Sequence, residues 1–463
     1  MTATQMRRWR VRERALLVVV FALTSWFPVA YVLDRQRPEV GSRAWPVTSF
    51  PTALLTAVVA VVLLDRFVVR RRPPVWACAA AVVTSWCLAA WVYLQWVPRY
   101  RPVSDRATAL EIGWRAIASG QDPYTFHTQL GNPIAPLPGG ILLAGPTMTV
   151  FGDLHWYGLI WAAVVLAVCW WGAGPAAATV VAVLGVVSPM IRLELYSQSD
   201  AWINAAALVV FGSAGWMALG RAAGGDAPRA PVFLARLRPR PCRARGTGVR
   251  HTIRRRGVAV TSRPSTTTLT AGAWTVAAVL AGVLFGLALA YRVILAPVAL
   301  PLAIAMWRQV GWRPAAAFVI PAATVALVAT LTPLLVNPSA LGPWTMAAHH
   351  ATSPRTPHLG AIITASMLLV TVVGARRARS LAAVWATAAA SLATMIAVVW
   401  WGQATGRPSY ETVAYDGALL VFTLAAFVGP RATRRGIPGP WRRAGRHAAR
   451  RGFFLTRRST HGA

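Results

Sequence analysis

Acidic residues are rare in this chain, and three of them lie where they could act as acids or bases. The 463 residues include only 13 aspartates and glutamates. Asp105, Glu111 and Asp122 lie close together within residues 98–138, between long apolar stretches. A carboxylate held at a membrane face can accept a proton from a hydroxyl group of a lipid-borne substrate. Residues 98–138 are therefore the first candidate for a catalytic segment.

The pattern of this segment predicts a helix that begins next to Asp105 and ends at Gly120. Its apolar residues recur at helical spacing, which indicates an amphipathic helix lying along the membrane surface. The start of this helix has two interpretations: Ser104 or Asp105 caps the helix N-terminus, or Asp105 presents a carboxylate to a substrate. Glu111 is a second candidate, and we expect it to pair with Arg115 four residues later. Asp122, Pro123 and Tyr124 then predict a turn.

The composition is that of an integral membrane protein, with 56% hydrophobic and 13% charged residues. Several apolar stretches are about 17–25 residues long, the length that a membrane crossing needs. We expect an all-α polytopic protein with about 12 transmembrane helices. Residues 141–151 are the first candidate for a re-entrant segment. The apolar stretches are residues 15–33, 47–64, 75–97, 141–151, 156–171, 176–191, 201–219, 271–291, 293–306, 315–336, 359–373, 381–401 and 414–428.

Arginine-rich connections give the predicted orientation, because cationic loops stay on the cytoplasmic side. They place both termini in the cytoplasm and residues 98–138, 192–200, 337–358 and 402–413 outside the plasma membrane. The net charge of +34 is explained by this bias, so membrane lipids, and not nucleic acid, are the expected partners. The chain then divides into an N-terminal membrane half (1–220), a basic flexible cytoplasmic loop (221–270), a C-terminal membrane half (271–428) and a basic tail (429–463).

The residue types also exclude several kinds of chemistry. All 47 basic residues are arginine, which excludes a phosphate loop built on lysine and a Schiff base. No histidine or cysteine spacing is typical of a zinc site, and we expect neither a metal nor another cofactor. Gly282 and Gly286 form a GxxxG pattern, which predicts a face for helix packing.

Further candidate residues lie outside the first loop. Arg292 interrupts an apolar run and either binds a phosphate with its guanidinium fork or extends to the membrane interface. Asp200, with Glu194, either orients an acceptor sugar or caps the helix that follows. His349 and His350 either hydrogen-bond a phosphate or are simply solvated loop residues.

Short segments of this chain resemble a known family. They are Asp105, Ala116-Ile117-Ala118-Ser119-Gly120-Gln121-Asp122-Pro123-Tyr124, the proline-containing return at residues 135–138, Leu193-Glu194-Leu195-Tyr196-Ser197-Gln198-Ser199-Asp200, and Tyr291-Arg292 through Pro297 with Trp307-Arg308. Together they are similar to the outer loops and later helices of GT-C glycosyltransferases. The closest is glycosyltransferase family 87, the polyprenyl-phosphate-mannose-dependent mannosyltransferases of actinobacteria.

The resemblance implies a GT-C-like helical bundle in which Asp105 is the general base. It also implies a polyprenyl-phosphate-sugar donor and a glycolipid or glycan acceptor. Substrate-binding residues are then expected at Glu111, Asp122, Tyr124, Gln198, Asp200, Arg292, His349 and His350. We therefore expect an inverting mannosyltransferase at the outer membrane face. The alternatives are a transporter or flippase for lipid-linked saccharides and a non-catalytic membrane scaffold.

Overall fold

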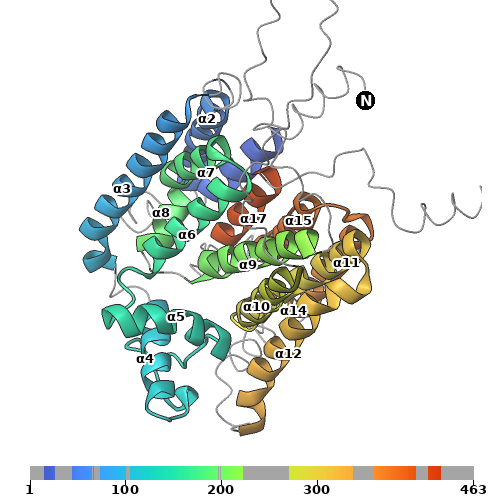
Figure 1. The fold of residues 1–463 in the computed structure, drawn as a ribbon. Helices are drawn as coiled ribbons and strands as arrows, with labels where there is room; N and C mark the ends of the chain where they lie inside the picture. The colour runs from blue at the N-terminus through green and yellow to red at the C-terminus, as the bar shows by residue number, and fades with distance from the viewer. Residues whose placement is uncertain are drawn as a thin grey trace, which may run out of the picture. The chain divides into compact units, whose positions relative to one another are not determined.

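The computed structural model describes residues 15–26, 44–64, 66, 73–100, 105–196, 198, 200–222, 271–336, 359–402 and 415–428. These residues are almost entirely helical, as Figure 1 shows. Within the described ranges there is no β-strand, and the only pairing of that kind is an isolated bridge between His127 and Pro133. The predicted all-α fold is therefore confirmed for the described part of the chain.

The helices of the N-terminal half follow the apolar stretches of the sequence. A first helix covers Ala15–Trp26. It is followed by α2 (Ala44–Leu64), α3 (Val75–Tyr100), α4 (Arg106–Ala118), the 3₁₀ turn η4 (Pro123–Thr125), α5 (Pro138–Phe151), α6 (Tyr157–Gly172), α7 (Pro175–Val187), α8 (Pro189–Tyr196) and α9 (Ala201–Ala222).

The C-terminal half is built in the same way. It contains α10 (Ala271–Leu289), the 3₁₀ segment η6 (Val293–Val298), α11 (Ala299–Val310), α12 (Trp312–Val336), α14 (Leu359–Arg377), α15 (Leu381–Gly402) and α17 (Asp416–Val428).

Four of these helices are long and apolar enough to cross a membrane: α3, α9, α10 and α12. A fifth crossing is formed if α7 and α8, which are bent by 75° at Ser188, count as one span. α5 and α6 are also apolar but shorter. These helices indicate a helical membrane protein, while the expected total of about 12 crossings stays a prediction.

Two of the apolar stretches, which the sequence already indicates to be broken by proline or glycine, are broken in the structure. Residues 176–191 divide into α7 and α8, because Pro189 cannot donate a backbone hydrogen bond and begins a new helix. Residues 293–306 begin as the 3₁₀ segment η6, which contains Pro297, and become α-helical only from Ala299. In both places a proline sets the break.

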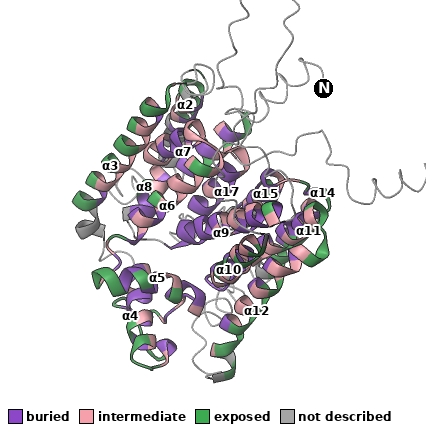
Figure 2. Ribbon diagram, viewed as in Figure 1, coloured by how far each residue is buried: buried purple, intermediate pink, exposed green. Residues whose placement is uncertain are grey.

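α9 lies at the centre of the packing and α3 at its edge. α9 contacts α10, α17, α6 and α11, and 72% of its apolar window is buried, against 11% for α3. Figure 2 shows the same contrast, with α9 mostly purple and α3 mostly green and pink. The exposed face of α3 includes Trp76 and Trp91, and large apolar side chains of this kind suit contact with lipid.

The predicted glycine face of α10 packs against α12. A Cβ on Gly282 would overlap the backbone carbonyl of Phe318, and one on Gly286 would meet the carbonyl of Ala322. Because neither glycine has a side chain, the two helix backbones come into direct contact. The GxxxG prediction is confirmed.

The predicted outer-loop helix is present as α4, but part of its apolar face is covered by protein. α4 packs against α5, and the two lie side by side in Figure 1. Ile141 contacts α4 at Gly113, and Trp114 contacts α5 at Gly145. The buried residues of α4 include Leu110 and Glu111. The sequence assigned this face to the membrane surface, whereas the structure uses it to hold α4 on α5.

Candidate functional site

Asp105 precedes α4 without capping it. Its side chain makes no capping hydrogen bond to the helix. Its Oδ2 instead accepts hydrogen bonds from the Thr128 hydroxyl at 2.8 Å and from the Asn132 side-chain amide at 2.7 Å. The capping interpretation is therefore wrong for Asp105, and Ser104 lies outside the described residues. Because both donors contact Oδ2, they orient the carboxylate and leave Oδ1 as the oxygen that can accept a proton.

A tight turn brings the two donors to Asp105. The Thr128 amide donates to the Asn132 carbonyl at 2.8 Å, and the Asn132 amide donates to the Thr128 hydroxyl at 3.3 Å. Gly131, between them, has a φ of 77°, a left-handed conformation that glycine adopts without strain. The Gly-Asn pair in the sequence thus forms a turn whose side chains point back at the carboxylate.

Asp122 and Tyr124 support the same loop from inside. The Asp122 carboxylate accepts the Tyr124 backbone amide at 3.0 Å and begins η4, so the predicted turn is present. The buried Tyr124 hydroxyl donates to the Pro136 carbonyl at 3.1 Å. Burial, with a smaller contribution from Asp122, raises the pKa of Tyr124 well above its usual value. Tyr124 therefore stays a neutral donor that ties the two ends of the loop together.

Glu111 is placed inside the protein. It is 4% exposed and accepts the Leu154 backbone amide at 3.2 Å. The predicted pair with Arg115 is present, with the charged atoms 4.0 Å apart. These contacts join α4 to the segment between α5 and α6. Glu111 therefore makes a structural contact, and Asp105 is the more accessible of the two carboxylates.

Asp200 and Arg292 form a buried ion pair between the two halves of the chain. The Arg292 Nη2 donates to Asp200 Oδ1 at 2.5 Å and to Oδ2 at 2.8 Å, and its Nε donates to Oδ2 at 3.2 Å. The Asp200 side chain is fully buried, and 19% of the Arg292 side chain is exposed. Asp200, expected to contact an acceptor or to cap α9, instead holds Arg292.

Two further side chains join this pair. Arg106 Nη1 lies 3.8 Å from Asp200 Oδ1, and Arg292 Nη1 donates to the Tyr415 hydroxyl at 3.4 Å. Arg106 follows Asp105 directly, and consecutive Cα atoms lie about 3.8 Å apart. Asp105 thus adjoins, through Arg106, a cluster of two arginines, one aspartate and one tyrosine, which lie at or just before the starts of α4, α9 and α17 and just after the end of α10.

Backbone contacts fix α5 to the end of α10, just before Arg292. The Leu137 amide donates to the Tyr291 carbonyl at 3.4 Å. A Cβ on Gly139 would overlap the Leu287 carbonyl oxygen, and one on Gly140 would overlap the Tyr291 ring. The two glycines at the return of the outer loop therefore permit an approach that other residues would block.

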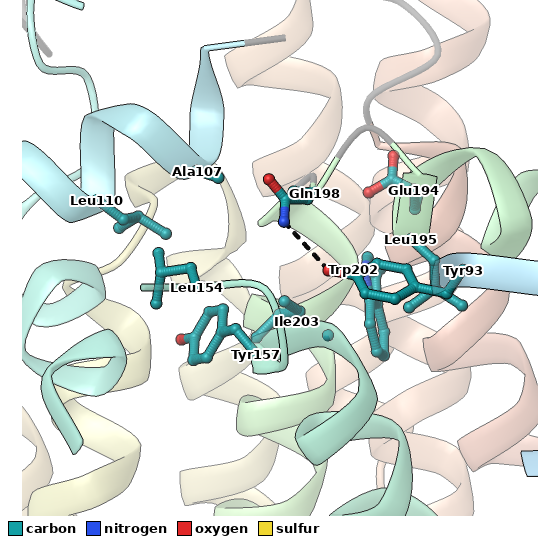
Figure 3. A pocket seen from close by; sticks show the side chains of 11 residues that line it. Tyr93, Ala107, Leu110, Leu154, Tyr157, Glu194, Leu195, Gln198, Trp202 and Ile203 are labelled. Atoms are coloured by element: carbon teal, nitrogen blue, oxygen red, sulfur yellow. Dashed lines mark hydrogen bonds between the residues drawn. The ribbon is translucent and has the colours of Figure 1, made fainter. Parts of the chain in front are cut away.

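Gln198 takes part in an internal network beside a small cavity (Figure 3). Its side-chain amide donates to the Tyr93 hydroxyl at 3.1 Å, and this hydroxyl donates to the His155 carbonyl. Gln198 has a φ of 50°, which is uncommon for a residue other than glycine. The cavity is lined by residues that include Glu194, Leu154 and Trp202 and has a volume of about 10 Å³. That volume suits one water molecule and excludes a sugar ring.

Sequence reasoning found Asp105 and Arg292 but missed the residues that contact them. The missed residues are of ordinary types: Thr128, Asn132, Arg106 and Tyr415. The Gly131-Asn132 pair, which is typical of a turn, is the one sequence feature that points to any of them, namely to Asn132. His349 and His350 lie outside the described residues. In the described ranges, no group of three or more histidine, cysteine, aspartate or glutamate side chains is arranged to hold a metal ion.

Comparison of the whole chain with protein-family models, with curated proteins and with solved structures finds no match.

Proposed function

We propose that this protein is an integral membrane glycosyltransferase. It moves a sugar from a polyprenyl-phosphate donor to a hydroxyl group of a lipid or glycan at the outer face of the plasma membrane. The resemblance to family 87 points to mannose as that sugar. One observation carries the proposal: Asp105, whose carboxylate is oriented by Thr128 and Asn132, directly precedes Arg106, and Arg106 reaches the ion pair of Asp200 and Arg292.

The two parts of this site match the two needs of the reaction. An acceptor hydroxyl is a weak nucleophile, so it needs a base as its oxygen attacks the anomeric carbon. Asp105 Oδ1 takes that proton. The bond from the anomeric carbon to the phosphate oxygen breaks, and the lipid phosphate leaves with the electron pair. Attack from the face opposite the phosphate inverts the configuration.

The leaving phosphate needs neutralisation of its charge more than it needs a proton. The cluster brings two guanidinium groups, those of Arg106 and Arg292, to one place. A phosphodiester carries one negative charge, and guanidinium groups bind phosphate oxygens with directed hydrogen bonds. Arg292 is partly buried next to apolar helices, a place where an ionisable residue is a functional hypothesis by default.

The test is sugar transfer in membranes that contain the wild-type chain, Asp105→Asn or the matched control Asp153→Asn. Asp153 is a carboxylate of the same outer region, and its side chain is 40% exposed. With labelled polyprenyl-phosphate mannose, the wild type and Asp153→Asn are expected to form a new mannosylated product. Asp105→Asn is expected to lose about 10²–10⁴-fold in rate. Equal rates for all three proteins would remove Asp105 as the base.

A transporter or flippase for lipid-linked saccharides is the second candidate, favoured by the 75° bend between α7 and α8. Broken helices form the substrate sites of many secondary transporters. Purified protein in vesicles separates the two functions. A transporter moves the labelled donor across the bilayer without forming a glycosidic bond, whereas the enzyme forms that bond without needing a second compartment.

A further inference from the structure

Asp200 occupies one edge of the Arg292 guanidinium, and Tyr415 contacts the other. A guanidinium group has five N–H donors, one on Nε and two on each terminal nitrogen. Asp200 accepts from Nε and Nη2. The edge formed by Nη1 and Nη2 is the second edge of the group that can bind two oxygens at once.

Tyr415 lies at this second edge. Its hydroxyl oxygen accepts a hydrogen bond from Arg292 Nη1 at 3.4 Å. A hydroxyl that accepts one hydrogen bond can donate its own hydrogen to another acceptor. Arg292 Nη1 and the Tyr415 hydroxyl can therefore donate to neighbouring oxygens of the same anion.

The ion pair makes this arrangement rigid. Asp200 is fully buried and also lies 3.8 Å from Arg106. Its two oxygens hold Arg292 through three hydrogen bonds, so the guanidinium, on a side chain that is 19% exposed, keeps its Nη1 edge in a fixed direction. Preorganised donors of this kind bind an anion without a cost of reorganisation at the moment of binding.

We propose that Tyr415 is a phosphate-binding residue that donates its hydroxyl hydrogen to a phosphate oxygen of a polyprenyl-phosphate lipid, while Asp200 positions Arg292 for the same phosphate group. This inference rests on the proposed function for the identity of the lipid. It adds Tyr415, the residue directly before α17, to the side chains that contact the phosphate, and it gives Asp200 the role of positioning Arg292.

The experiment measures binding of polyprenyl phosphate and of neutral polyprenol to the purified full-length protein in detergent. The variants are Tyr415→Phe, Arg292→Gln and both together. The control is Tyr157→Phe, which removes a buried tyrosine hydroxyl on α6 that is not among the hydrogen-bond partners of Arg292. A hydrogen bond to a charged group corresponds to a change of roughly 10- to 100-fold in affinity.

We expect Tyr415→Phe to weaken binding of polyprenyl phosphate by that factor and to leave polyprenol binding unchanged, which also shows that the variant is folded. Tyr157→Phe should bind both lipids as the wild type does. In the double variant, loss of the hydroxyl should add little to loss of Arg292, because the two groups act on one phosphate.

The outcomes separate this inference from the proposed function. If Tyr415→Phe binds polyprenyl phosphate as tightly as the wild type, the role of Tyr415 is overturned while the enzyme proposal stands. If the wild type does not prefer polyprenyl phosphate over polyprenol, both fail. Equally tight binding of inorganic phosphate would overturn the lipid assignment. If phosphate-dependent binding is found but no sugar is transferred, the inference stands and the enzyme proposal fails.

Discussion

Asp105 and Asp200 are two carboxylates in very different surroundings. Asp105 is partly exposed and accepts hydrogen bonds from two neutral side chains, both at one oxygen. Asp200 is fully buried, and its two oxygens accept three hydrogen bonds from Arg292, with Arg106 close by. Both residues directly precede a helix, so their positions in the sequence do not distinguish them.

The difference decides which carboxylate has an oxygen available to a substrate. Both oxygens of the buried Asp200 accept hydrogen bonds from Arg292. A carboxylate with neutral donors on one oxygen can accept a proton on the other. Asp200 thus holds Arg292 in place beside Arg106, and Asp105 is the carboxylate suited to act as a base.

Removing the buried carboxylate is expected to give the largest change in stability. Asp200→Ala leaves Arg292 with uncompensated charge, and breaking such a pair costs about 3–5 kcal/mol. Unfolding of the purified protein in mixed micelles measures the loss. A matched Asp153→Ala change, which removes one hydrogen bond from the His155 amide to an exposed carboxylate, should lower the free energy of unfolding by about 0.5–1.5 kcal/mol. Equal losses for the two variants would show that the Asp200 pair contributes nothing to folding.

Glu111 should fall between the two aspartates. Glu111→Ala leaves the buried Leu154 amide without its acceptor, and an unsatisfied buried donor costs about 1–3 kcal/mol. The same unfolding measurement applies. Arg115→Ala, at an exposed side chain of the same ion pair, should change stability by less than about 1 kcal/mol. A larger effect at Arg115 would mean that the ion pair outweighs the hydrogen bond.

The donors to Asp105 are expected to have smaller effects. Thr128→Val and Asn132→Ala each remove one hydrogen bond to Oδ2, worth about 0.5–1.5 kcal/mol of stability. Because both donors orient one carboxylate, the double variant should show a coupling between them. Strict additivity of the two free energies would contradict a shared orienting role.

Asp105→Asn is expected to change stability least, by about 0.5 kcal/mol or less. The amide carbonyl of the new side chain can accept from Thr128 and Asn132 in place of Oδ2. The fraction of protein that remains folded after heating in detergent measures this. A loss as large as that of Asp200→Ala would make Asp105 a structural residue and would break the contrast between the two carboxylates.

The helices were largely predictable because their apolar stretches and arginine-rich connections follow directly from the sequence. The GxxxG contact between α10 and α12 and the pair of Glu111 with Arg115 were predictable for the same reason, since both depend on local spacing. The breaks at Pro189 and within η6 could also have been read from the prolines.

The contacts of the candidate site could not be predicted in this way. Asp200 and Arg292 are separated by 92 positions, and Arg292 and Tyr415 by 123. No local pattern records which helix ends meet across such distances. For the same reason, the choice between a helix cap and a functional carboxylate at Asp105 needed the positions of Thr128 and Asn132.

The glycine contact between α5 and α10 has a mechanical consequence. Gly139 and Gly140 bring the return of the outer loop against the backbone that leads into Arg292. A hinge that lifted α4 and α5 as a lid would have to separate these close-packed backbones. Under the proposed function, the base and the phosphate-binding edge would then be held in one frame, and substrates would have to reach it without such a lid opening.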